Sequence, residues 1–282
     1  MHKIEVLNID EFIIQKKIHE NDIGALFVAR NKKTHKLVMV KTLAQDVLSH
    51  ILGEDNFIHK IINIISKITH PIFPKFIGYS SFDFSHLPNP AIITEFCGNT
   101  TLKSVIDSEK LSSADFTWDK TKKLKIIYGI AHAMSFLHSH GIILRNLSPE
   151  YIILDDEYNP KIVDFSLIEY YDLKKKEITS YPIYSAPEVI LDGKYSPKSD
   201  VFSFAMIVYE LLFNKMPYEI CPNIEKYITT GQRPSLDDKT IDNLYIQLIE
   251  ECWSQNPDKR PSFSQIIQKL KEETGFISSG IF

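Results

Sequence analysis

Two short segments carry the residues whose types and spacing could do chemistry. Residues 143–156 have the sequence ILRNLSPEYIILDD, and DFSL begins at Asp164, twenty-one positions after Ile143. This is the layout of a catalytic loop followed by a metal-binding turn, because a loop carboxylate can accept a proton and a turn carboxylate can hold Mg²⁺. Asp164 can serve the second purpose. The central polar residue of the loop, however, is Asn146, an amide with no basic function near neutral pH.

The composition is that of an ordinary globular protein. The chain has 282 residues, of which 44% are hydrophobic and 24% charged, enough for the core of one large domain or two lobes. Its net charge of -4 argues against nucleic acid and against an anionic membrane as partners. We therefore expect a protein that binds other proteins or small molecules.

The cysteines and the apolar runs bear on where the protein works. Cys97, Cys221 and Cys252 are far apart and odd in number, which argues against disulfides or a zinc site and for a reducing compartment. Residues 1–12 alternate charged and hydrophobic residues, unlike a signal peptide. The densest apolar run, residues 204–213, is too short to span a bilayer. A cytoplasmic or nuclear protein without a membrane partner is expected.

The segments that must position these residues fall into two parts with different sequence patterns, a strand-like part and a helix-like part. The first hundred residues are rich in β-branched runs separated by turn-like segments, and they predict a small β part. Isoleucines spaced by three or four within residues 56–68 predict one helix there. Later segments have helical periodicity, and the junction near residues 95–100 contains Gly98 as a hinge candidate. Strands are expected at 12–18, 25–30, 36–43, 76–82 and 91–96, and later helices at 121–141, 198–213 (with Ser199 and Asp200 as cap candidates), 240–253 and 262–273.

Eight short segments carry a resemblance to a known family. In chain order they are VMVK ending at Lys41, THP (69–71), TEFCG (94–98), LRNLSPEY (144–151), DFS (164–166), APE (186–188), SDVFSFA (199–205) and CWSQNPDKRPSF (252–263). In this order and spacing they resemble the eukaryotic protein-kinase family. The last two are most similar to the tyrosine-kinase-like branch of the serine/threonine kinases.

The resemblance covers roughly residues 11–272 and implies an α+β, bilobal kinase fold. It places a small β-rich lobe at about 11–96 and a larger, mainly helical lobe at about 97–272, with short extensions at 1–10 and 273–282. It also implies an ATP cleft between the lobes. The positions that match the nucleotide-binding residues of the family are Gly24, Met39, Lys41, Glu95, Cys97 and Ile153.

The phosphate-binding part of this cleft departs from the family pattern. Only Gly24 matches the glycine-rich loop, since His19 and Asn21 stand at its first two glycine positions. Lys41 matches the phosphate-binding lysine, but the expected glutamate partner is Ile61, which cannot form an ion pair and is expected to pack inward. We therefore expect Lys41 at the cleft without its usual partner. Met39 replaces a small residue and either fills part of the base pocket or moves aside.

The catalytic loop departs further. The resemblance assigns the proton acceptor to position 146, where Asn146 cannot act as a base, and replaces the loop lysine by Ser148. No catalytic residue of the loop is thus intact. Tyr151 replaces the asparagine that would hold a second metal ion, and its ring is not expected to bind metal. Mg²⁺ could be held through Asp164 only, so ATP binding is expected to be weak at best.

Other matching residues have structural tasks in the family. The resemblance implies a buried ion pair between Glu188 and Arg260, and a hydrogen bond from the loop backbone to Asp200. Leu144, in place of the loop histidine, and Phe165 are expected to pack between the lobes near Ile65. The lost residues are thus those that handle phosphate, metal and proton, and the kept residues are those that support folding.

These observations favour a pseudokinase, a kinase fold that acts as a signalling scaffold or allosteric binding module. Its partners would be proteins, namely signalling proteins or an active kinase, bound through the helix at 56–68 or the loop at 164–188 with its lysines at 174–176. One alternative is a weakly active serine/threonine kinase that uses Lys41 and Asp164. The other is a switch that binds ATP without transferring phosphate.

Overall fold

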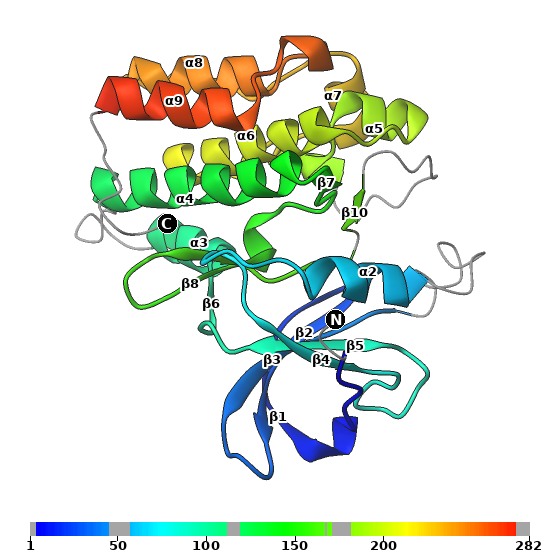
Figure 1. Ribbon diagram of the computed structural model, residues 1–282. Helices are drawn as coiled ribbons and strands as arrows, with labels where there is room; N and C mark the ends of the chain where they lie inside the picture. The colour runs from blue at the N-terminus through cyan, green and yellow to red at the C-terminus, as the bar shows by residue number, and fades with distance from the viewer. Residues whose placement is uncertain (1–3, 45–56, 112–118, 167, 171–181, 275–282) are drawn as a thin grey trace.

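The protein has two lobes, one built on a sheet and one built of helices (Figure 1). The computed structural model describes residues 4–44, 57–111, 119–166, 168–170 and 182–274. The small lobe contains β1 (Phe12–Asn21), β2 (Gly24–Asn31), β3 (Leu37–Thr42), α2 (Phe57–Ile65), β4 (Phe76–Ser80) and β5 (Ala91–Glu95). The large lobe contains β6 (Thr100–Thr101), α3 (Leu102–Leu111), α4 (Lys120–Ser139), β7 (Ile142–Ile143), β8 (Ile152–Leu154), β9 (Pro160–Ile162), β10 (Glu169–Tyr170), α5 (Pro187–Asp192), α6 (Pro197–Phe213), α7 (Ile224–Thr229), α8 (Asn243–Cys252) and α9 (Phe263–Thr274).

The small lobe is an antiparallel five-stranded sheet in the order β1-β2-β3-β5-β4. β1 and β2 form a tight hairpin in which Asn21 pairs with Gly24. Glycine is required there because φ is +144° and a Cβ would lie 2.0 Å from the carbonyl oxygen of Thr42. The α+β bilobal fold predicted from the sequence is confirmed.

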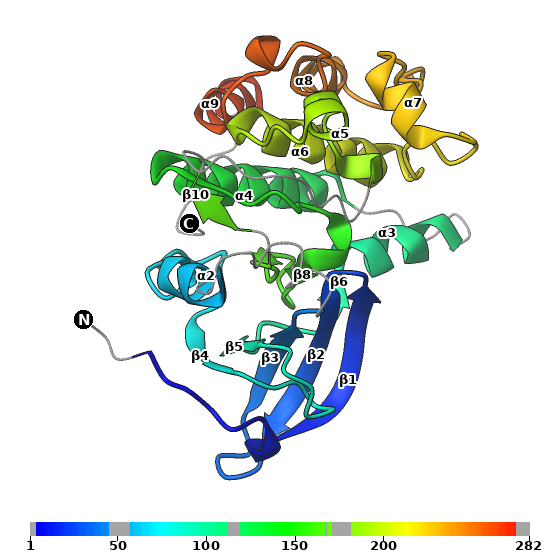
Figure 2. The same ribbon diagram turned by 90° about the vertical axis from the view of Figure 1, so that its right-hand side faces the viewer.

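Helix α2 lies against the sheet, on the side that faces the large lobe (Figure 2). Ile61, Ile62 and Ile65 are buried, so the predicted apolar stripe is indeed the packed face. The helix ends at Ile65, earlier than predicted, and residue 56 lies outside the described residues. Residues before β1 also add to the sheet, since Leu7 donates a backbone hydrogen bond to Tyr79 and Tyr79 donates one to Glu5.

The large lobe is centred on α6, which is buried almost all round. The helix begins with a capping box: the Ser196 side chain accepts from the Lys198 N–H, and the Ser199 hydroxyl accepts from the Ser196 N–H. The N-cap is therefore Ser196, and the prediction of Ser199 or Asp200 as the cap was wrong. The chain leaves the helix at Asn214 in the left-handed conformation that commonly ends a helix.

Two further features concern the helices as possible membrane spans and the state of the cysteines. Within the described part of the chain, every helix is too short or too polar to cross a membrane. Cys97, Cys221 and Cys252 are all free thiols.

Candidate functional site

Apolar side chains from both lobes form one buried cluster at the cleft. Met39 belongs to a buried cluster with Leu26 and Val28 from the small lobe. From the large lobe the same cluster includes Tyr151, Ile153 and Val163. Met39 is 1% exposed within this cluster. Both alternatives for Met39, a partly filled base pocket and a side chain moved aside, stay predictions.

Lys41 has a partner that the sequence did not reveal. Its Nζ lies 3.3 Å from Oδ2 of Asp164 and donates a hydrogen bond of 3.2 Å to the hydroxyl of Tyr151. The Nζ also lies 4.5 Å from the centre of the Tyr151 ring. The partner of Lys41 is therefore Asp164 rather than the usual helix glutamate, whose position is taken by Ile61. Burial lowers the pKa of Lys41, and the carboxylate of Asp164 opposes that shift.

The two carboxylate oxygens of Asp164 have different contacts. Oδ1 accepts hydrogen bonds from the N–H of Ser166, at 2.8 Å, and from the Ser166 hydroxyl, while Oδ2 faces Lys41. Ser166 stands where the family has glycine, and its hydroxyl adds a donor that glycine lacks. A serine two residues after an aspartate often makes this turn bond, which is the signal that sequence reasoning left unused.

The β1–β2 hairpin uses its own backbone donors. Oδ1 of Asn21 accepts from the N–H groups of Ile23 and Gly24, at 3.0 and 3.2 Å. In a phosphate-binding loop such N–H groups would face the ligand. The ring of His19 instead meets Tyr151 edge-on, with centroids 5.2 Å apart. Burial lowers the pKa of His19, and the nearby ammonium of Lys41 lowers it further.

The loop position that the family uses for the proton acceptor is buried in this chain. Asn146 and Ser148 are buried, and among the described residues both amide atoms of Asn146 and the Ser148 hydroxyl have no hydrogen-bond partner. An amide in this environment neither accepts a proton nor donates one. No group at this position can therefore assist a hydroxyl nucleophile.

The shape of the loop is maintained by Asp200. Its carboxylate accepts hydrogen bonds of 3.0 Å from the N–H groups of Leu144 and Arg145, and it lies 2.9 Å from Nε2 of His138. Arg145 has a φ of +73°, and its guanidinium lies 4.0 Å from the centre of the Tyr195 ring. The role of His138 could not be inferred from the motif, because His138 lies on a separate helix.

Glu188 and Arg260 form a bidentate ion pair, with distances of 2.6 and 2.8 Å. Arg260 is 1% exposed and also donates to the carbonyl oxygens of Ser254 and Lys198. Four hydrogen bonds thus hold this buried guanidinium. This pair joins the start of α5 to the segment before α9.

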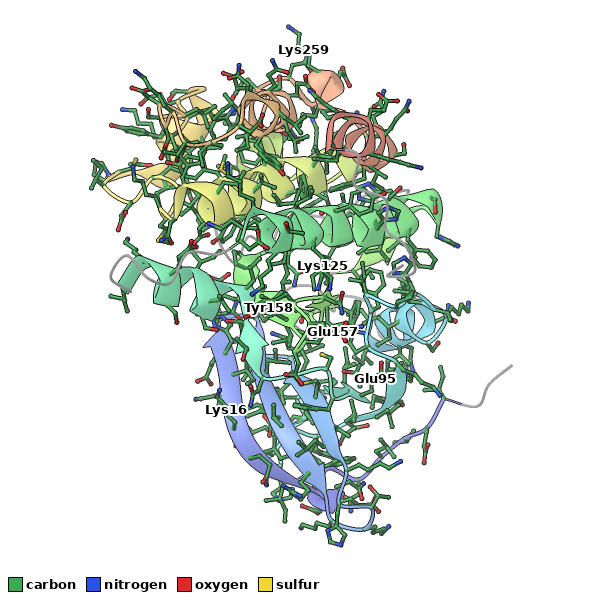
Figure 3. All side chains as sticks on the ribbon, turned by 90° about the vertical axis from the view of Figure 1, so that its left-hand side faces the viewer. Lys16, Glu95, Lys125, Glu157, Tyr158 and Lys259 are labelled. Atoms are coloured by element: carbon green, nitrogen blue, oxygen red, sulfur yellow. The ribbon has the colours of Figure 1, made fainter. Side chains whose placement is uncertain are left out.

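The remaining predicted residues are spread over different parts of the fold. Ile61, Leu144 and Phe165 belong to the main buried core together with Ile65. Glu95 has an exposed side chain near the lobe junction, whereas Lys259 lies at the far end of the large lobe (Figure 3). Burial raises the pKa of the Cys97 thiol to about 12, so this cysteine is not a reactive thiolate. The lysines at 174–176 lie outside the described residues.

The two-lobed fold, with a strand lysine and a turn aspartate meeting between the lobes, defines the protein-kinase class. The family model described as protein tyrosine and serine/threonine kinase matches residues 12–270, and the chain belongs to this family. Members of the family generally use ATP with Mg²⁺.

Individual relatives are similar over almost the whole chain. It is 31% identical over 281 residues to the putative serine/threonine-protein kinase/receptor R818 of Acanthamoeba polyphaga mimivirus, covering 96% of the chain and 16% of that protein. It is 27% identical over 277 residues to the probable serine/threonine-protein kinase gdt2 of Dictyostelium discoideum, covering 94% of the chain and 16% of that protein. It is 28% identical over 272 residues to the mouse cytoplasmic tyrosine-protein kinase BMX, covering 93% of the chain and 39% of that protein. The chain thus spans well under half the length of these relatives.

The residues of the cleft do not fit ATP with Mg²⁺. Oδ1 of Asp164 accepts from Ser166, while the buried Oδ2 lies 3.3 Å from the Nζ of Lys41 and has no hydrogen-bond partner among the described residues. Tyr151 presents a phenol where a second metal ligand is needed. The hairpin N–H groups of Ile23 and Gly24 are taken by Asn21. The arrangement therefore pairs Lys41 with Asp164, leaves Asp164 as the one matching metal ligand of the family pattern, and leaves phosphate without the two hairpin N–H donors.

Proposed function

We propose that the chain is a pseudokinase domain, which acts by binding other proteins rather than by transferring phosphate. The observation that carries the proposal is the internal contact of Lys41 with Asp164 and Tyr151. The two groups that should hold phosphate and metal are occupied with each other. Asn146 also offers no base for a substrate hydroxyl.

Protein partners are part of the proposal. The fold keeps the bidentate Glu188–Arg260 pair and the Asp200 bonds to the loop, which supports a domain that keeps its shape without catalysing phosphate transfer. The class of partner we propose is a signalling protein or an active kinase. The activity of the whole relatives named above does not transfer to this domain by similarity alone.

Phosphotransfer to a generic protein substrate, with Mg²⁺ and labelled ATP, tests the proposal directly. We expect no transfer above background, and no difference between the natural chain and Lys41→Ala. A thermal-shift titration with ATP should show little or no shift that depends on Mg²⁺. Robust turnover that Lys41→Ala abolishes would overturn the proposal.

The second candidate is a weakly active serine/threonine kinase. It is favoured by the presence of Lys41 and Asp164 in one cleft and by the names of the relatives, which are serine/threonine-protein kinases. It requires the ion pair to open and Asp164 to take a metal ion. The same assay separates the two candidates, because only the second expects turnover that depends on Lys41.

A further inference from the structure

Tyr151 is enclosed by groups from the small lobe. It is 2% exposed, and its hydroxyl accepts a hydrogen bond of 3.2 Å from Lys41 on β3. The ring of His19 on β1 meets it at 5.2 Å and an interplanar angle of 89°. Side chains from β1 and β3 of the small lobe thus contact Tyr151, which belongs to the large lobe.

The ring of Tyr151 also takes part in the apolar contact between the two lobes. Tyr151 packs in one buried cluster with Met39 of β3 and with Ile153 of β8. Aromatic rings bury a large area and contribute strongly to such contacts. The lobes are therefore joined across the cleft by contacts between their own side chains.

Binding of a nucleotide would have to undo these contacts. The triphosphate needs the ammonium of Lys41, which lies within 3.3 Å of Asp164 and over the Tyr151 ring. It also needs the space beside the hairpin, where His19 meets that ring. Since only the opened form can bind, the apparent affinity falls in proportion to the small fraction of open molecules.

We propose that Tyr151 blocks the nucleotide cleft from inside and is the residue that prevents binding of Mg²⁺–ATP. We call this role of Tyr151 the plug. This inference rests on the proposed function, since it explains why the domain does not use nucleotide. It makes a separate claim, however, because loss of the base at Asn146 would prevent catalysis even with the cleft open.

Three substitutions test the plug by isothermal titration with Mg²⁺–ATP. Tyr151→Asn removes the ring and supplies a short carbonyl, so we expect binding at least about tenfold tighter than that of the natural chain. Tyr151→Phe keeps the ring and should stay within about threefold of the natural chain. Tyr158→Asn is the matched control: Tyr158 lies outside the cleft at a φ of +64°, which asparagine tolerates, and affinity should not change.

Each result supports or overturns the plug. Equal affinity of Tyr151→Asn and the natural chain overturns it, as does a gain for the Tyr158→Asn control of the same size. If Tyr151→Asn does not give folded protein by circular dichroism, His19→Gly takes its place. That variant loosens the ring from the hairpin side and should bind more tightly than the natural chain, and no gain overturns the inference.

The phosphotransfer assay is kept separate. Turnover by the natural chain refutes the proposed function, whatever Tyr151→Asn binds. No turnover together with no gain in binding refutes only the plug. Binding of ATP by Tyr151→Asn without turnover supports both.

Discussion

At the residue scale, Asn146 is the position where a single substitution, to aspartate, would restore the proton acceptor of the family pattern. We expect that Asn146→Asp alone leaves phosphotransfer at background, because Ser148, Tyr151 and Ile61 still replace the groups that handle phosphate and metal. The substitution also puts a charge on a site that is 7% exposed. Burial of a charge without a partner should lower the free energy of unfolding by at least about 1 kcal/mol.

Urea unfolding and a phosphotransfer assay check this prediction together. Asn99→Asp, which makes the same change on an exposed residue, is the control and should leave the unfolding midpoint in place. Recovery of turnover in Asn146→Asp would contradict the prediction, since it would mean that the base was the only missing group.

The residue-scale chemistry could be predicted only in part. The motif located Lys41, Asp164 and Tyr151 in one cleft, but it gave no sign that they contact one another. Lys41 and Asp164 come from strands and turns of different lobes, and a pairing between lobes depends on how far the lobes close. The missing glutamate at Ile61 was a usable signal, because a buried lysine must find another partner.

At the element scale, the Glu188–Arg260 pair determines how α5 is attached to the segment before α9. Arg260→Met leaves the Glu188 carboxylate without its guanidinium partner in a partly buried position. We expect a loss of about 3–5 kcal/mol in the free energy of unfolding. The pair Lys269–Glu251, which is much more exposed than Arg260, is the matched control, and Lys269→Met should cost at most about 1 kcal/mol.

Chemical unfolding of both variants at neutral pH measures the difference. Equal losses for Arg260→Met and Lys269→Met would contradict the structural role of the buried pair. A double variant, Glu188→Gln with Arg260→Met, should recover part of the loss, because it also removes the unpaired carboxylate.

Long elements were predicted well and short ones were not. Helices α4 and α6 lie within one residue or two of the expected ranges, because many periodic apolar positions fix them. Helix α3 and the strand pairs β6–β8 and β8–β9 were missed. Strands of two or three residues have too few positions to show a period, and their partners are distant in sequence.

At the scale of the whole molecule, the lobes also meet at a group of rings behind the cleft. His70, in the loop after α2, contacts Phe136 of α4 with centroids 4.9 Å apart, and Phe73 of the same loop contacts Phe165 at 5.8 Å. His132 lies one turn before Phe136 on α4. The lobe junction therefore contains His70 within an aromatic contact, while the ring of His132 contacts Tyr128 on the same helix.

The stability of this junction should depend on pH. Burial lowers the pKa of His70 below its ordinary value of 6.5, as do the nearby His132 and Lys161, and burial also lowers the pKa of His132. The folded state thus favours the neutral rings, while the unfolded chain takes up protons as the pH falls through 6.5. The stabilisation is complete above that pH and is lost progressively below it.

Thermal unfolding between pH 7.5 and 5 should therefore show a midpoint that falls as the pH drops, in a range chosen around the ordinary histidine pKa. His70→Asn should flatten this decline, because the amide oxygen can still accept the N–H of Ile72, as Nδ1 of His70 does, but does not titrate. His59→Asn, at an exposed position of α2, is the control and should keep the decline of the natural chain. A decline equally steep in His70→Asn would place the pH sensitivity elsewhere in the molecule.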